Sequence, residues 1–176
     1  MDERELWKRI SNGDPEAFDE FYRECAPRLL SFLRHLLGEH QAAEDVMQSA
    51  FSELWRRPGR FDPERGSLRA WLFGVARKQA MEWWRKRRPE DELTDKPAPC
   101  YFETSSIVAD AFNQLPAEQR ALLWLREVEG QSYAELAAIL DIPLGTVRSR
   151  LFAAREALRA IWVQTPTLRG GRHDLQ

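Results

Sequence analysis

Residues 132–155, SYAELAAILDIPLGTVRSRLFAAR, constrain the fold more than any other stretch of this chain. Ser132, with Glu135 three residues later, forms a capping box, which predicts that a helix begins there. The Asp-Ile-Pro sequence of residues 141–143 predicts its end, because proline lacks a backbone donor and restricts the residue before it. The same proline suits the first turn of a second helix. The stretch therefore predicts two short helices joined by a tight turn, the outline of a helix-turn-helix.

The second of these helices has two chemically distinct sides. Its apolar side carries Val147, Leu151, Ala154 and Leu158, and its basic side carries Arg148, Arg150, Arg155 and Arg159. In a helix-turn-helix the second helix lies in the major groove, where arginine binds guanine edges and phosphates. A helical hairpin of a bundle, with arginines that are only solvated, is the alternative. Glu135 is the only charge on the first helix, and this asymmetry favours DNA.

The distribution of charge indicates a polyanion-binding segment that the net charge of −2 conceals. Residues 1–55 hold 6 basic and 12 acidic side chains, residues 56–88 hold 11 and 3, and residues 89–108 hold 1 and 5. The net charges of the three segments are therefore −6, +8 and −4. A basic block between two acidic ones is the electrostatic pattern expected of a nucleic-acid-binding protein.

Apolar residues at helical spacing predict an all-α fold, and no segment has the alternation typical of a strand. The helices expected are a short one within residues 1–12, then 14–38, 41–57, 68–88, one from about residue 107, one from about residue 116, and the two described above. Asp14 followed by Pro15 is a helix start, and Gly38 is a stop. Pro27 is expected to kink or interrupt the helix between them.

The predicted helix 68–88 interleaves aromatic and cationic side chains in the sequence RAWLFGVARKQAMEWWRKRR. Its aromatic residues are Trp71, Phe73, Trp83 and Trp84. Bases stack on such rings at about 1–3 kcal/mol each while cations hold the backbone, so the pattern favours single-stranded nucleic acid. The alternative is that Trp71 and Trp83 are core residues and the arginines form a solvated helix end.

Composition separates two domains and excludes several classes of function. Residues 89–106 are acidic and proline-rich, which predicts a linker between domains 1–88 and 107–162, with a flexible tail over 163–176. Two distant cysteines and three scattered histidines predict no disulfide, metal site or cofactor. No signal peptide, membrane span, phosphate-binding glycine loop or catalytic triad is visible, so a cytoplasmic protein without enzymatic activity is expected.

Taken in order, these segments resemble the extracytoplasmic-function (ECF) sigma factors of the sigma-70 family, over about residues 14–158. DPEAFDEFYRECAPRLLSFL, AEDVMQSAFSELW, FDPERGSLRAWLFGVARK and RKRR resemble the sigma-2 domain. LPAEQRALLWLREVEGQSYAELAAILDIPLGTVRSRLFAARE resembles the sigma-4 domain. The resemblance implies a sigma-2 bundle and a sigma-4 helix-turn-helix domain joined by an extended acidic linker. It also implies binding to core RNA polymerase and to promoter DNA, control by an anti-sigma factor, and a free protein that is monomeric.

The resemblance implies roles for individual residues as well. Those that match the polymerase-docking helix are Asp45, Gln48, Phe51, Leu54 and Trp55, and the core is the alternative role of Phe51 and Leu54. Those expected to open the duplex and bind the downstream element are Arg69, Trp71, Arg77, Lys78, Trp84 and Arg85. Those expected at the upstream element are Arg126, Arg148, Ser149, Arg150, Phe152 and Arg155, with Arg126 on a phosphate. Many relatives have asparagine at Lys78 and some have arginine at Ala153, so the promoter preference is expected to differ.

A stand-alone helix-turn-helix regulator is the alternative function. Such a protein would bind duplex DNA unaided, typically as a dimer on two half-sites, and residues 1–88 would then serve dimerisation or sensing. A sigma factor is instead expected to bind core polymerase and to bind promoter duplex weakly when alone.

Overall fold

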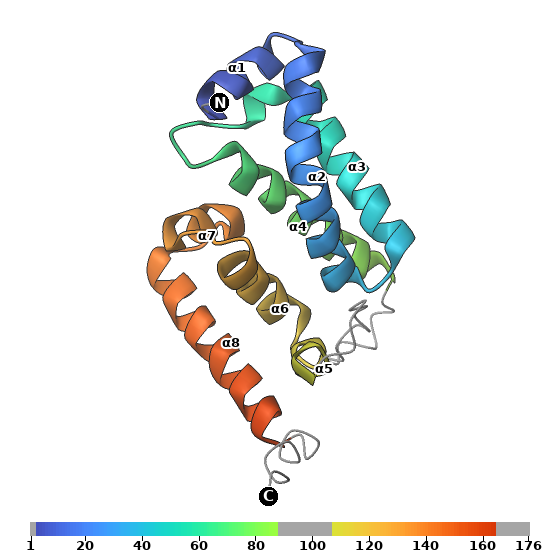
Figure 1. Ribbon diagram of the computed structural model, residues 1–176. Helices are drawn as coiled ribbons and strands as arrows, with labels where there is room; N and C mark the ends of the chain where they lie inside the picture. Colours follow the sequence, from blue (N-terminus) through green and yellow to red (C-terminus); the bar gives the residue numbers. More distant parts are fainter. Residues whose placement is uncertain (1–2, 88–106, 165–176) are drawn as a thin grey trace, which may run out of the picture.

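The computed structural model describes residues 3–87 and 107–164, and every regular element in these two segments is a helix (Figure 1). The N-terminal domain comprises α1 (Glu3–Ser11), α2 (Pro15–Leu37), α3 (His40–Arg56), the short η1 (Pro58–Arg60) and α4 (Leu68–Arg87). The C-terminal domain comprises α5 (Ile107–Asn113), α6 (Ala117–Leu123), the π-helical η2 (Trp124–Val128), α7 (Tyr133–Leu140) and α8 (Leu144–Gln164). The expected linker 89–106 lies outside the described residues. Of the expected tail 163–176, the first two residues belong to α8 and the rest also lies outside the described residues.

Helix α2 begins and ends as the sequence predicted. The Asp14 carboxylate accepts hydrogen bonds from two backbone N–H groups of the first turn, at 2.9 and 3.2 Å, which satisfies donors that the helix itself leaves open. Gly38 adopts a left-handed conformation with φ 69°, and its N–H donates to the Arg34 carbonyl. The predicted interruption at Pro27 is wrong, because α2 is continuous through it. The apolar stripe on both sides of Pro27, including Cys25 and Leu29, is buried, and this packing holds the two halves together.

The N-terminal domain is a bundle in which α2 packs against α1, α3 and α4. Its core consists of side chains from all four helices that are almost completely buried, among them Ile10, Phe21, Leu29, Phe32, Leu33, Leu54, Leu68, Leu72 and Phe73. Phe73, one of the aromatic residues predicted to interleave with cations, thus lies in this core. Cys25 is also buried, and burial raises the pKa of its thiol to about 12, so the thiol stays protonated and unreactive.

The C-terminal domain contains the predicted helix-turn-helix. The capping box is present: the Ser132 hydroxyl accepts from the Glu135 N–H at 3.1 Å, and the Glu135 carboxylate accepts from the Ser132 N–H at 2.7 Å. Asp141 ends α7 in the left-handed region, at φ 54°. Helix α8 buries Val147 and the rest of the predicted apolar side down to Ala154, whereas Leu158 is half-buried. These features confirm the two helices and the tight turn.

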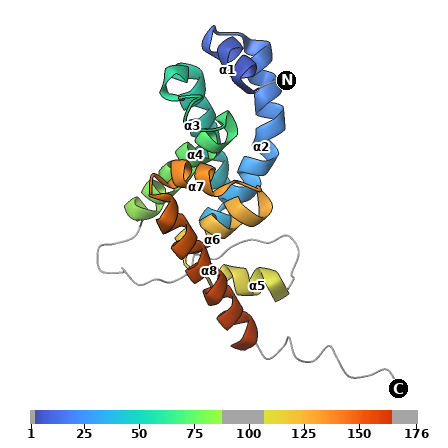
Figure 2. The same cartoon turned by 90° about the vertical axis from the view of Figure 1, so that its left-hand side faces the viewer.

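The two domains pack against each other, an arrangement that the sequence left open. Helix α7 lies against α4, and α6 lies against α2, as two perpendicular views show (Figure 1, Figure 2). The buried apolar residues form one continuous core that extends through both domains. The His35 and Trp124 rings stack across the contact, with centroids 4.1 Å apart. None of the helices described is both long and apolar enough to cross a membrane.

Candidate nucleic-acid interface

A stripe of three predicted strand-binding residues runs along α4. Trp71, Lys78 and Arg85 are spaced seven residues apart, close to two helical turns, so they share one face of the helix. Lys78 and Arg85 are exposed, and Trp71 is half-buried. An aromatic ring followed by two cations along a helix is the combination that holds a base and the backbone beside it. We call these three residues the α4 stripe.

The Trp71 ring is held in place by the loop before α4. Phe61, which is buried, contacts Trp71 edge-on with ring centroids 6.1 Å apart. Phe61 also contacts Trp7 of α1 at 5.8 Å, and the Trp7 indole N–H donates to the Pro58 carbonyl at 3.2 Å. Each such aromatic pair contributes about 0.5–1.5 kcal/mol beyond its burial. Helix α1 and the loop therefore support the Trp71 ring on the side that Phe61 contacts.

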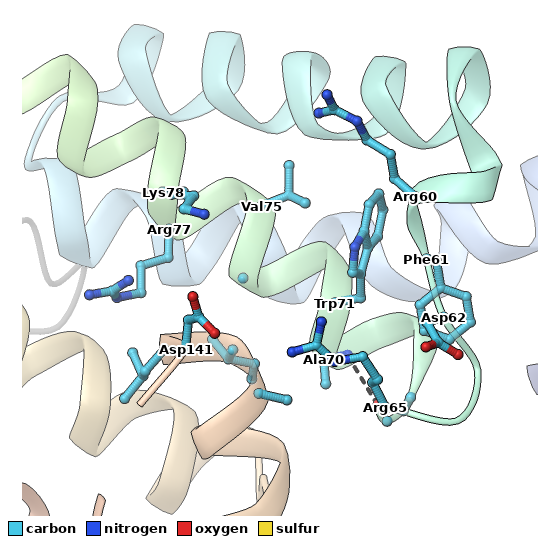
Figure 3. Close-up of a pocket in the computed structure, with 16 residues that line it drawn as sticks. Arg60, Phe61, Asp62, Arg65, Ala70, Trp71, Val75, Arg77, Lys78 and Asp141 are labelled. Atoms are coloured by element: carbon cyan, nitrogen blue, oxygen red, sulfur yellow. Dashed lines mark hydrogen bonds between the residues drawn. The ribbon is translucent and has the colours of Figure 1, made fainter. Parts of the chain in front are cut away.

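A cleft opens beside the α4 stripe, with a volume of about 280 Å³. Figure 3 shows Trp71 and Phe61 at one end of this cleft and Arg77 and Lys78 at the other. The cations lining it are Arg60, Arg65, Arg77 and Lys78, and the acids are Asp62 and Asp141. Asp141 comes from the C-terminal domain, so both domains form the walls. The excess of cations suits a segment of a polyanion.

Sequence reasoning did not single out Phe61, Arg60 or Arg65 in this loop. The two arginines belong to the basic block 56–88, so the charge count already contained the signal for them. Phe61 is a lone aromatic residue in a loop rich in proline and glycine, where no periodicity marks a residue as buried.

Three residues predicted to act with the α4 stripe contact other helices instead. The Arg69 guanidinium is 2.9 Å from the Glu24 carboxylate of α2. The Trp84 indole N–H donates to the Leu36 carbonyl at 3.3 Å, which fixes this half-buried ring against α2. The Arg77 side chain is only 14% exposed and lies 2.5 Å from Glu118 of α6. The structure therefore brings together Trp71, Lys78 and Arg85, and engages the other three in contacts within the protein.

The predicted docking residues of α3 divide into a surface set and a core set. Asp45 and Gln48 are exposed, and Trp55 is 41% exposed, with its ring edge-on to Phe18. These three positions share one face of α3, because their spacing follows the helical repeat. Phe51 and Leu54 are buried in the core and have no surface to offer a partner. The candidate docking surface therefore comprises three of the five predicted residues: Asp45, Gln48 and Trp55.

Helix α8 presents most of its predicted residues to solvent. Arg148, Ser149 and Arg150 are exposed, and Phe152 is 68% exposed, an unusual environment for a phenylalanine. Arg148 and Phe152 are four residues apart and share one side, whereas Arg150, two residues on, points to the other flank. A cation beside an apolar ring suits a guanine edge next to a thymine methyl group.

Two of the predicted upstream residues make contacts within the domain instead. The Arg155 guanidinium is 2.6 Å from the Glu127 carboxylate, and this hydrogen bond raises the pKa of Arg155 above its usual range. The Arg126 guanidinium donates to the Gln131 carbonyl at 2.8 Å and lies over the Tyr133 ring at 5.0 Å. Arg126 thus joins η2 to the start of α7 and positions the helix-turn-helix.

Family models and known proteins match both halves of the chain. The model of sigma-70 region 2 matches residues 21–90, and that of sigma-70 region 4 matches residues 105–158. The RNA polymerase sigma-H factor of Pseudomonas aeruginosa is 31% identical over 177 residues, covering 89% of this chain and 91% of the relative. The ECF sigma-E factor of Escherichia coli K12 is 29% identical over 174 residues, covering 87% and 90%. The chain therefore belongs to the extracytoplasmic-function sigma factors of the sigma-70 family.

Solved structures agree with this assignment. CnrH, in complex with the cytosolic domain of CnrY, is similar with a TM-score of 0.71 and 26% identity, covering 90% of this chain and 96% of that one. RpoE of Bartonella quintana, in complex with the anti-sigma factor NepR, has a TM-score of 0.67 and 27% identity, covering 84% and 98%.

Proposed function

We propose that this chain acts in the cytoplasm as a non-enzymatic initiation factor that binds core RNA polymerase and directs it to specific promoters. One observation carries the proposal: two helices, one in each domain, present cations beside an exposed or partly exposed aromatic ring. These are the α4 stripe and the Arg148–Phe152 side of α8. Two such surfaces in one chain fit a promoter with two separated elements.

The two surfaces differ in the form of DNA that they suit. The α4 stripe offers a ring for stacking, which requires an unpaired base, so we assign it to the opened downstream element. The side of α8 with Arg148 and Phe152 offers groups that match major-groove edges, so we assign it to the duplex upstream element. The exposed face of α3 with Asp45, Gln48 and Trp55 is then the surface for core polymerase.

An anti-sigma factor is the further partner that we propose. The solved structure of RpoE from Bartonella quintana contains the anti-sigma factor NepR, and that RpoE covers 84% of this chain. The similarity of this chain to that RpoE, with a TM-score of 0.67, supports a partner of the same kind.

Reconstitution with core RNA polymerase and a library of promoter fragments tests the proposal. We expect transcription starts that require this chain and share two spaced sequence motifs. Trp55→Ala should weaken polymerase binding at least tenfold, because a large exposed ring in an interface is a typical hot spot. Ser11→Ala, at an exposed position on α1 rather than α3, is the control and should bind normally. Absence of polymerase binding together with tight unaided duplex binding would instead identify a stand-alone regulator.

A further inference from the structure

Helix α1 holds the loop before α4 at both of its ends. The Trp7 indole N–H donates to the Pro58 carbonyl at 3.2 Å, where the loop begins. The Glu3 carboxylate accepts from the Leu68 N–H at 3.0 Å, where the loop ends and α4 begins. The three residues of η1 are the one regular element of this loop, so contacts from outside must fix its conformation.

The middle of the same loop connects α1 to the α4 stripe through three rings. The rings of Trp7 and Phe61 have centroids 5.8 Å apart and planes inclined at 74°. The rings of Phe61 and Trp71 follow at 6.1 Å and 64°. Both geometries are of the edge-to-face type that aromatic pairs prefer. We call these three residues the aromatic relay.

Trp7 is not the residue that anchors α1 to the bundle. Leu6 and Ile10 are 4% and 1% exposed and hold α1 in the core, whereas Trp7 is half-buried. The hydrogen bond and the ring contact of Trp7 both go to the loop. The relay can therefore be cut at Trp7 without removing the side chains that hold α1 in place.

We propose that Trp7 is a positioning residue for capture of the opened strand: through Phe61 it holds the Trp71 ring in the orientation on which a base stacks. This inference rests on the proposed function of the α4 stripe. A ring that is fixed before binding loses less conformational freedom when the base arrives, so positioning strengthens stacking. Phe61 and Trp71 line the cleft beside the α4 stripe, and Trp7 acts on the strand through them.

A double-mutant cycle in the reconstituted holoenzyme tests the proposal. Trp7→Leu removes the ring and the indole N–H but keeps an apolar side chain. Open complexes should decay about threefold faster, since one ring pair of the relay is lost, while duplex binding through α8 stays unchanged. In a Trp71→Ala background the same change should have no further effect, because Trp7 acts through that ring.

Two further variants show whether the effect belongs to the relay. Trp7→Phe keeps a ring against Phe61 and should restore at least half of the lost lifetime of the open complex. Trp83→Leu, at another half-buried ring on α4, is the matched control and should leave the decay rate unchanged.

Fluorine NMR of the free chain reports the positioning without polymerase. With 5-fluorotryptophan incorporated, the Trp71 resonance is the one that Trp71→Phe removes. Trp7→Leu should shift or broaden this resonance through Phe61, and Trp83→Leu should leave it in place. Phe61→Leu leaves α1 unchanged and should have the same effect as Trp7→Leu, which provides a second way to cut the relay.

The outcomes separate this inference from the proposed function. A Trp71 resonance that stays in place in both Trp7→Leu and Phe61→Leu would overturn the positioning. Equal acceleration of open-complex decay with and without the Trp71 ring would overturn it too, because Trp7 would then act by another route. If the unmodified chain forms no open complex with core polymerase, the proposed function fails, and the fluorine spectrum still decides whether Trp7 holds the Trp71 ring.

Discussion

The two helices assigned to DNA differ in how ready they are to bind it. Helix α8 runs away from the N-terminal domain (Figure 1, Figure 2). Its Arg148, Ser149 and Phe152 are exposed. Helix α4 instead lies against α7, and its Arg77 is paired with a carboxylate of the other domain. The upstream surface is thus clear of the N-terminal domain, whereas the C-terminal domain forms one wall of the cleft beside the α4 stripe. Recognition of duplex and capture of a single strand can therefore occur as separate steps.

The largest effect is expected at α8. Arg148→Ala should cost about 1–3 kcal/mol of promoter binding by the holoenzyme if this arginine contacts a base edge. The loss should be confined to one position of the upstream element, measured as affinity for promoters with single base changes. Arg150→Ala, on the other flank of the same helix, is the matched control and should keep discrimination at that position. An equal loss on every sequence would assign Arg148 to a phosphate.

A somewhat smaller effect is expected at α4. Trp71→Ala should cost about 1 kcal/mol of open-complex stability, at the lower end of the range for a stacked base, because the ring is already half-buried. Duplex binding through α8 should not change. The measurement is the rate of open-complex decay, with permanganate footprinting of unpaired thymines. Trp83→Ala, elsewhere on α4, is the control, and equal effects of both variants would show that the ring acts only through the fold.

Removing the Glu118 charge should make α4 more available to DNA and so reduce the difference in availability between α4 and α8. Glu118→Gln takes away the carboxylate beside Arg77, an ion pair with a partly exposed partner that contributes about 0.2–1 kcal/mol. The free chain should then bind single-stranded DNA up to a few-fold more tightly at low salt, as measured by fluorescence anisotropy. Glu127→Gln, which removes the partner of Arg155 on α8, is the control and should leave strand binding unchanged. Weaker strand binding by Glu118→Gln would show that Glu118 supports the site.

The smallest effect concerns pH. Burial against Trp124 lowers the pKa of His35 below its usual 6.5, and the nearby Arg34 and Arg120 charges act in the same direction, while its bond to the Ser31 carbonyl opposes them. Below pH 6.5 the unfolded chain therefore binds a proton that the folded chain does not, and stability falls as the pH drops. The midpoint of urea unfolding should decrease between pH 7.5 and 5.5. His35→Gln should show a flatter dependence, and a steeper one would contradict this origin.

The ends of the helices were predictable because the signals that set them act over only a few residues of the chain. The cap at Asp14, the stop at Gly38 and the capping box at Ser132 are bonds between close neighbours in the chain. The exposed side of α8 followed from periodicity alone, because Val147 and its apolar partners fix which side turns inward. For α8 the sequence therefore predicted the element and its buried side, whereas the single basic side predicted for its arginines is wrong, because Arg150 lies on the flank opposite Arg148.

The same reasoning could not sort the residues of α4, because their partners are distant in the sequence. The carboxylates beside Arg69 and Arg77, and the carbonyl that binds the Trp84 indole, come from other helices. Nothing near these residues signals that they are engaged. The continuity of α2 through Pro27 has the same cause, since burial against other helices outweighs a local preference.

Glu135 shows what these shared contacts mean for exchanging parts between related proteins. One of its carboxylate oxygens caps α7, and the other accepts from Ser67 in the N-terminal domain. In a chimera that joins this C-terminal domain to the N-terminal domain of a relative, the first bond travels with the domain and the second depends on the new neighbour. Such a hybrid should keep its upstream specificity, which resides in the C-terminal domain. It should lose the bond between residue 67 and Glu135 unless the new N-terminal domain also has a donor there. The contact between the two domains of a hybrid therefore depends on which N-terminal domain is chosen.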